Sequence, residues 1–135
     1  MINTRKVEEN IKYAVEVLKE RCEKQGGYPE TFKGYVSSLG ASMIQGHWQA
    51  AIAFYSNSGE AQDDRTEIPA MILEMIKRST NNKNNKAEIR ENSLLEFVLN
   101  NPNSKKMILE HLVALKLALN LFQPLPKSNE GSSAG

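Results

Sequence analysis

The chain contains a single cysteine, two histidines and no long run of apolar residues. Cys22 alone cannot form an internal disulfide, and His47 and His111 lie too far apart to form a zinc motif with it. Neither a membrane span nor a signal-peptide pattern is present. Neither GxGxxG nor GxxxxGK[ST] occurs, so no phosphate-binding loop is predicted. We expect a cytoplasmic protein without membrane association, metal or cofactor.

An excess of charge of one sign is also missing, because the formal net charge is only +1. A protein that coats nucleic acid by itself usually carries a diffuse positive field, so any contact with nucleic acid must come from a local patch. The 135 residues fit one domain, and the 40% apolar content excludes disorder over most of the length. We predict a single helical domain over residues 1–123 and, from the Pro, Ser and Gly content, a disordered tail over 124–135.

Apolar residues recur at steps of three and four over most of the chain, which is the spacing of one helix face. This period predicts helices at about 4–25, 30–44, 47–56, 68–78, 94–99 and 107–122. No alternation typical of strands competes with it. The predicted fold class is all-α, a compact bundle of about six helices.

Polar and small residues mark the expected helix ends. Thr4 is a candidate cap for the first helix, and Gly26 can end it. Asn92 or Ser93 can cap the fifth helix, and Ser104 the last. The last helix is apolar nearly all round, which predicts the buried centre of the bundle or a partner surface. The second helix is expected to bury its apolar residues, namely Phe32, Tyr35, Val36, Leu39, Met43 and Ile44.

One stretch departs from the charge balance of the whole chain. Residues 77–90 carry five cations against the single carboxylate of Glu88, and the segment 79–86 reads as a polar surface loop. Cations on such a loop can neutralise phosphates without reading bases; a plain solvated loop is the alternative. The predicted nucleic-acid contacts are this group and the start of the last helix: Lys77, Arg78, Lys83, Lys86, Arg90, Lys105 and Lys106.

Catalytic groups are not apparent in the sequence. Asp63 and Asp64 form an acidic doublet in a predicted loop, which solvated loop charge explains more simply than acid–base catalysis. Ser37 and Ser38 have no histidine at a motif spacing. His47 beside Trp48 reads as a helix-start histidine next to a packing tryptophan. We therefore expect no enzymatic activity.

The segment Tyr35 to Gly46, YVSSLGASMIQG, is followed by AAIAFY at Ala50–Tyr55. In order and spacing it resembles the central motif of the small subunit of the Cmr-type (type III-B) CRISPR effector complex. That family shows a Tyr-x-Ser start, a Met-Ile or similar pair, a glycine and an Ala-x-Ala-Phe run. The match covers about 21 positions, and His47-Trp48 stands where members often carry a glycine-leucine type of pair.

The resemblance implies a small, non-catalytic, all-helical protein that works in RNA-guided antiviral defence. It implies several copies stacked beside the backbone subunits of the effector, along the guide RNA and its paired target RNA. Cleavage is implied to belong to other subunits. This agrees with the residues, because base pairing would supply sequence specificity and a modest basic surface would suffice.

Two other classes of function stay open. A helical protein-interaction adaptor unrelated to CRISPR could use the exposed side of the last helix as its docking surface. A helix-turn-helix DNA binder centred on Gly46 is less favoured, because the helix that follows, from Trp48 to Tyr55, has no lysine or arginine for base or backbone contacts.

Overall fold

A computed structural model describes residues 2–23, 26–57, 65–83 and 89–122. Within these ranges the chain forms six helices and no strand, which confirms the predicted all-α bundle. The helices are α1 (Thr4–Cys22), α2 (Thr31–Gln45), α3 (Trp48–Ser56), α4 (Glu67–Lys83), α5 (Leu94–Asn100) and α6 (Lys105–Leu119). The acidic doublet Asp63-Asp64 and the expected tail at 124–135 lie outside the described residues.

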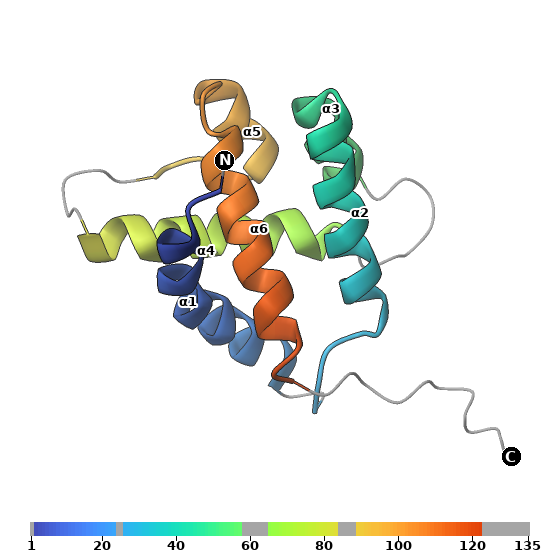
Figure 1. Cartoon of the computed structure of the whole chain (residues 1–135), viewed down its shortest axis with the longest axis vertical. Helices are drawn as coiled ribbons and strands as arrows, with labels where there is room; N and C mark the ends of the chain where they lie inside the picture. Colours follow the sequence, from blue (N-terminus) through green and yellow to red (C-terminus); the bar gives the residue numbers. More distant parts are fainter. Residues whose placement is uncertain (1, 24–25, 58–64, 84–88, 123–135) are drawn as a thin grey trace, which may run out of the picture.

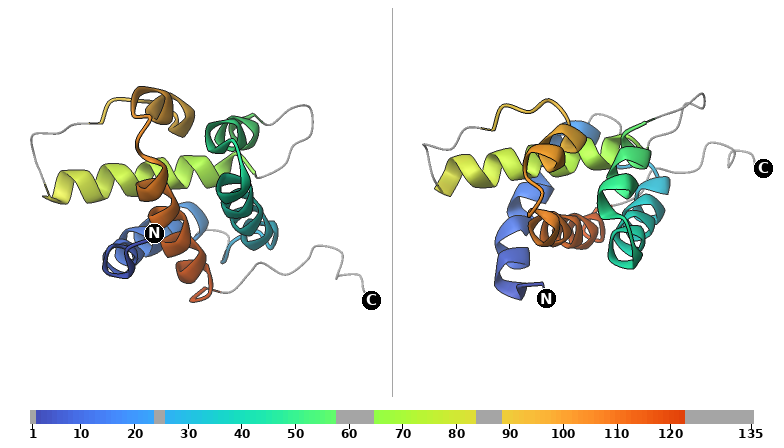
Figure 2. Two further views of the ribbon diagram at one scale, coloured as in Figure 1. Left: turned by 45° about the horizontal axis from the view of Figure 1, so that its top comes forward. Right: turned by 90° about the horizontal axis from the view of Figure 1, so that it is seen from above.

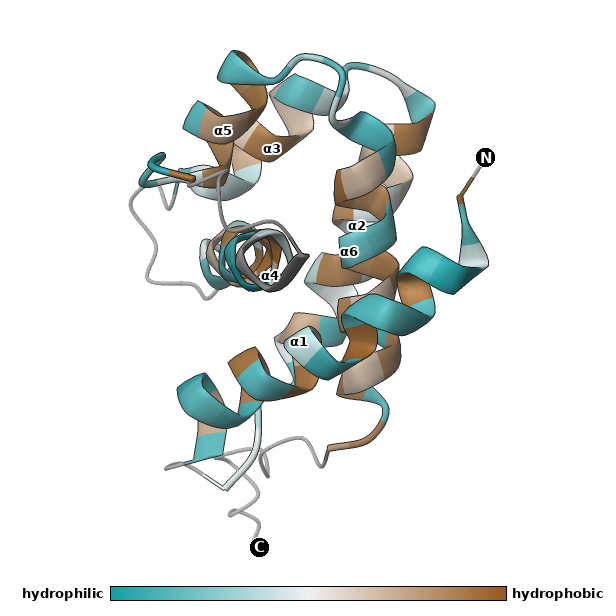
Figure 3. Cartoon of the chain, turned by 90° about the vertical axis from the view of Figure 1, so that its left-hand side faces the viewer, coloured by the Kyte–Doolittle hydropathy of each residue, from teal (hydrophilic) through white to brown (hydrophobic). Residues whose placement is uncertain are grey.

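Helix α4 crosses the molecule and contacts each of the other five helices (Figure 1). Figure 2 shows the same arrangement from two further sides, with α2 and α3 lying side by side and α2 packed against α6. Viewed down its axis, α4 lies between α1 on one side and α3 with α5 on the other (Figure 3). The last helix was expected to be the buried centre of the bundle or a partner surface; α6 is largely buried, and α4 is buried at the centre beside it.

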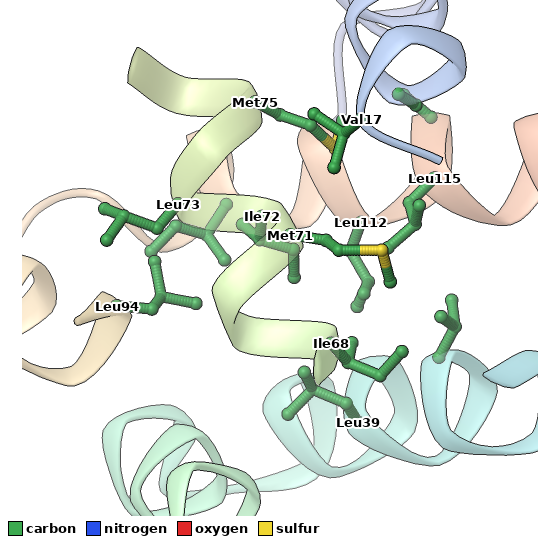
Figure 4. Packing of buried hydrophobic residues seen from close by; sticks show 14 of the residues in the cluster. Val17, Leu39, Ile68, Met71, Ile72, Leu73, Met75, Leu94, Leu112 and Leu115 are labelled. Atoms are coloured by element: carbon green, nitrogen blue, oxygen red, sulfur yellow. The ribbon is translucent and has the colours of Figure 1, made fainter. Parts of the chain in front are cut away.

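The core draws side chains from all six helices around the apolar face of α4. Met71 points toward Leu112 and Leu115 of α6, and Met75 points toward Val17 of α1 (Figure 4). Met71, Ile72 and Met75 are fully buried. The polar side of α1 faces outward in Figure 3, as its amphipathic pattern predicts.

Polar side chains cap the starts of α1 and α5, as predicted, but the residue that caps α1 is a different one. The cap of α1 is Asn3, not Thr4: its Oδ1 accepts from the N–H groups of Arg5 and Lys6. This helix ends at Cys22 with Glu23 as its C-cap, and Gly26 follows with a φ of 83°, a left-handed conformation that glycine adopts without steric cost. Ser93 caps α5 by accepting from the Glu96 N–H at 3.0 Å, as expected.

Ser104 occupies the N-cap position of α6 but does not accept from the helix. Its hydroxyl donates instead to the Asn101 carbonyl at 2.7 Å. The first turn of α6 therefore has no side-chain cap, so its N–H groups retain the partial positive charge of a helix start.

Two predictions of local structure were wrong. The segment 79–86 was expected to be a loop; α4 continues to Lys83, because Ser79 is buried and tertiary contact outweighs weak helix propensity, while 84–86 lie outside the described residues. Ile44 was expected in the core, but it is 66% exposed, because it lies in the last turn of α2, where it lines an open surface groove beside the start of α6.

Candidate nucleic-acid interface

The predicted cations do not form one cluster. Lys77 and Arg78 lie on α4, Arg90 is exposed before α5, and Lys105 and Lys106 begin α6. Lys83 is the last residue of α4, and Lys86 lies outside the described residues. The charge excess between 77 and 90 is therefore divided among separate parts of the molecule.

Arg78 is already occupied by carboxylates. Its guanidinium pairs with Glu16 and Glu20 of α1 and with Glu74 one turn earlier in α4. The hydrogen bond to Glu20 raises the pKa of Arg78 and lowers the pKa of Glu20 below its ordinary value. This arginine joins α1 to α4, and a phosphate would have to displace these carboxylates to reach it.

Lys77 has an acidic neighbour of its own. The pKa of Glu91 lies below its usual value, chiefly because Asn100 donates a hydrogen bond to its carboxylate and to a smaller extent because Lys77 is nearby. Lys77 thus contributes to the electrostatics of the link between α4 and α5.

Lys105 and Lys106 lie beside Ile44 and Trp48, in the middle of the segment 35–55. They line a shallow groove of about 610 Å³ together with Ile2, Ile44, Trp48, Pro102, Asn103 and Leu109. Ile44 is exposed and Trp48 half-buried, so an apolar and aromatic surface adjoins two ammonium groups. We call this surface the basic groove.

A second depression adjoins the basic groove and shares Asn103 and Lys106 with it. It is a pocket of about 490 Å³ between the starts of α1 and α6 and the last part of α4. We call it the polar pocket; its other lining residues are Asn3, Lys6, Asn10, Ser79, Thr80, Met107, Glu110 and His111. Figure 1 shows the N-terminus beside the start of α6, as this arrangement requires.

Lys6 was missed by the sequence reasoning. It lies a hundred positions before Lys106 in the chain, and no local charge window connects the two. They line the same pocket, where the Asn3 N–H donates to Glu110 Oε2 at 2.9 Å and links the start of α1 to α6. The cations that the fold brings together are therefore Lys6, Lys105 and Lys106.

Ser79 and His111 are in contact at the wall of the polar pocket. Ser79 Oγ lies 3.3 Å from His111 Nε2 and donates to the Ile76 carbonyl at 3.1 Å. His111 Nδ1 lies 2.8 Å from the Met107 carbonyl, so it carries a proton and donates there. Both side chains are buried. Each side chain is thus oriented by a carbonyl of its own helix, and the contact between them lies where α4 packs against α6.

The fold and this surface define a helical bundle with a basic groove and an adjoining polar pocket at one end. The described residues hold no group of three or more His, Cys, Asp or Glu side chains placed to share a metal ion. None of the described helices has the length and apolar content needed to cross a bilayer. No protein-family model, no curated protein and no solved structure matches the chain.

Proposed function

We propose that this chain is a non-catalytic structural subunit of a type III-B CRISPR effector ribonucleoprotein. Several copies stack along the complex, beside the backbone subunits, and contact the guide and target RNA through phosphates. Bonds are cleaved by other subunits. The proposal starts from the motif resemblance, whose residues form the paired helices α2 and α3.

One observation carries the proposal furthest, namely the basic groove. It joins Ile44 of the motif, and Trp48 at the point where the chain departs from the family pattern, to Lys105 and Lys106. Ammonium groups neutralise phosphates without reading sequence. An exposed isoleucine beside a tryptophan is a surface that a neighbouring protein chain can cover. A subunit that contacts RNA and protein at once needs both chemistries side by side.

The distribution of exposed apolar side chains supports stacking. Ile44 lies near the start of α6, while Leu117 and Leu121, 41% and 69% exposed, lie at the other end of that helix. End-to-end stacking needs two different complementary surfaces on each copy, because a heterologous contact propagates instead of closing into a dimer. A near-neutral chain also suits a stack, since highly charged copies would repel one another.

Among the predicted RNA contacts, Lys105, Lys106 and Arg90 are the first to test. Arg78 is held by three carboxylates, so it is a weaker candidate for a phosphate contact. Lys77, Lys83 and Lys86 remain proposed contacts, as the charge pattern of the sequence predicts.

The decisive experiment reverses charge in the basic groove. Lys105→Glu/Lys106→Glu should leave the fold intact, because acidic residues are favourable in the first turn of a helix. In an assembled complex, this variant should weaken target-RNA binding by about the same factor for unrelated sequences. The slope of log affinity against log salt should fall by roughly 0.7–0.9 for each lost phosphate contact.

A matched control makes the same change of charge elsewhere. Lys33 and Lys116 are exposed on α2 and α6 and line neither depression, so Lys33→Glu/Lys116→Glu should bind RNA as the unaltered chain does. If the unaltered chain, the groove variant and the control variant had the same affinity and the same salt slope, the groove would not be an RNA contact. Failure to co-purify with effector subunits and guide RNA would remove the proposed function.

A protein-interaction adaptor unrelated to CRISPR is the second candidate, and exposed Leu117 and Leu121 favour it. The genomic neighbourhood separates the two, because genes for the other effector subunits next to this one support the first function. Their absence, together with RNA-independent capture of a single protein partner that Leu117→Ser/Leu121→Ser abolishes, would favour the adaptor.

A further inference from the structure

The floor of the polar pocket holds two buried polar side chains with unused hydrogen-bonding capacity. Asn10 is 5% exposed, and its amide forms no hydrogen bond with the described part of the chain. Glu110 is 3% exposed; Oε2 accepts from the Asn3 N–H at 2.9 Å, while Oε1 has no donor among the described residues. Their unbonded atoms are open to solvent in the pocket, because the only enclosed side-chain polar atom without a partner among the described residues is the Tyr28 hydroxyl. Their placement on a pocket floor points to a ligand that supplies the missing bonds.

The mouth of the pocket has the opposite charge. Lys6 and Lys106 are exposed there, and neither forms an ion pair within the described residues. Lys106 also belongs to the uncapped first turn of α6, where free N–H groups favour an anion. A ligand that fits has an anionic group at the mouth and hydrogen-bond donors at the floor.

We propose that the polar pocket binds a guanine nucleotide, with the base on Asn10 and Glu110 and the phosphate on Lys6 and Lys106. Guanine presents adjacent N1–H and N2–H donors to a carboxylate and an O6 acceptor to an amide N–H. Adenine has no such pair of donors on that edge, so Glu110 disfavours it. The pocket of about 490 Å³ lies within the usual range for small-ligand sites.

This inference goes beyond the proposed function and holds whether or not the chain joins a ribonucleoprotein. The guanine can come from a free nucleotide or from an unpaired residue of an RNA strand, because both present the same base edge and phosphate. Binding to the isolated chain tests the pocket, whereas assembly and RNA binding of the complex test the proposed function. The two can therefore fail separately.

The test is calorimetric titration of the isolated full chain with GMP, AMP and inorganic phosphate. We expect GMP to bind at least tenfold more tightly than AMP or phosphate, because only GMP satisfies floor and mouth together. Equal affinities for GMP and AMP, or no GMP binding at millimolar concentrations, would overturn the proposal. This comparison uses only the unaltered chain, so a folding defect in a variant cannot affect its result.

Two variants then test which residues bind the base at the floor and which bind the phosphate at the mouth. Glu110→Gln should reduce GMP affinity tenfold or more and leave phosphate affinity unchanged. Lys6→Ala/Lys106→Ala, both exposed positions, should weaken GMP and phosphate alike and reduce the salt dependence. Lys33→Ala, outside the pocket, should change nothing. GMP affinity unaffected by a folded Glu110→Gln protein contradicts the assignment of the floor.

A final arm identifies the source of the guanine. Tighter binding of GMP than of a short single-stranded RNA with one guanine indicates a free nucleotide, and the reverse indicates an unpaired RNA base. Both results support the pocket. Equal binding of that RNA and of the same RNA with adenine in place of guanine contradicts it.

Discussion

The contacts of Arg78 in the fold differ from those that its neighbours in the sequence suggest. In the sequence it belongs to a cationic stretch that suggests phosphate binding. In the fold it pairs with Glu16 and Glu20, which lie about sixty positions earlier in the chain, and with Glu74 of its own helix. Its first role is therefore to hold α1 against α4.

We predict that Arg78→Ala lowers the free energy of unfolding at neutral pH by about 1 kcal/mol. The figure is small because the carboxylate partners are about half exposed and solvent screens such pairs. High salt should reduce the difference. Arg5, exposed and outside any ion pair in the described residues, provides the control: Arg5→Ala should unfold in urea at the same midpoint as the unaltered chain.

The same interaction sets a pH dependence. Arg78 lowers the pKa of Glu20 in the folded state, so the unfolded chain binds more protons in acid. The stabilisation is complete above the unfolded pKa of ~4.3 and is lost as pH falls through the lower, folded pKa. Urea titrations should therefore show the gap between Arg78→Ala and the unaltered chain closing in this window. A gap that is constant down to pH 3 would contradict the pairing.

At the scale of the element, helix packing explains a glycine of the resemblance motif. A Cβ at Gly40 of α2 would lie 3.3 Å from Leu112 Cδ2 of α6, whereas at Gly34 of the same helix it would meet nothing within 4 Å. The small residue at 40 thus permits the close approach of α2 to α6.

Gly40→Val should destabilise the protein by about 1–3 kcal/mol, because the added methyl groups overpack the contact between α2 and α6. Gly34→Val is the matched control within one helix. It should be neutral or slightly stabilising, since valine has a better helix propensity than glycine. Thermal unfolding followed by circular dichroism compares the two; similar midpoints would mean that the contact at Gly40 relaxes freely.

The sequence predicted the helices well and the surface poorly, for a physical reason. The helical period and caps are local, so α1, α5 and α6 were found close to their observed bounds. The exposure of Ile44, the continuation of α4 past Arg78 and the meeting of Lys6 with Lys106 depend on neighbours far away in the chain. No pattern within one helix encodes them.

At the scale of the molecule, the shared core predicts cooperative unfolding. The buried cluster includes side chains from all six helices, and α4 contacts each of the others, so no helix pair has a core of its own. A domain of this size with one core should unfold in a single two-state transition. The described helices should then lose structure together, including the α2 and α3 pair.

The single tryptophan, Trp48 at the start of α3, makes this testable. Its fluorescence reports the α2 and α3 pair, while far-ultraviolet circular dichroism reports all helices, and the two urea transitions should coincide. Met71→Ala, fully buried in α4 between helices, should cost about 2–5 kcal/mol and move both curves by the same amount. If the fluorescence midpoint stayed the same while the dichroism midpoint shifted, α2 and α3 would form an independent unit. The basic groove, which α3 and α6 share, would then not be rigid enough to present its lysines at a fixed spacing.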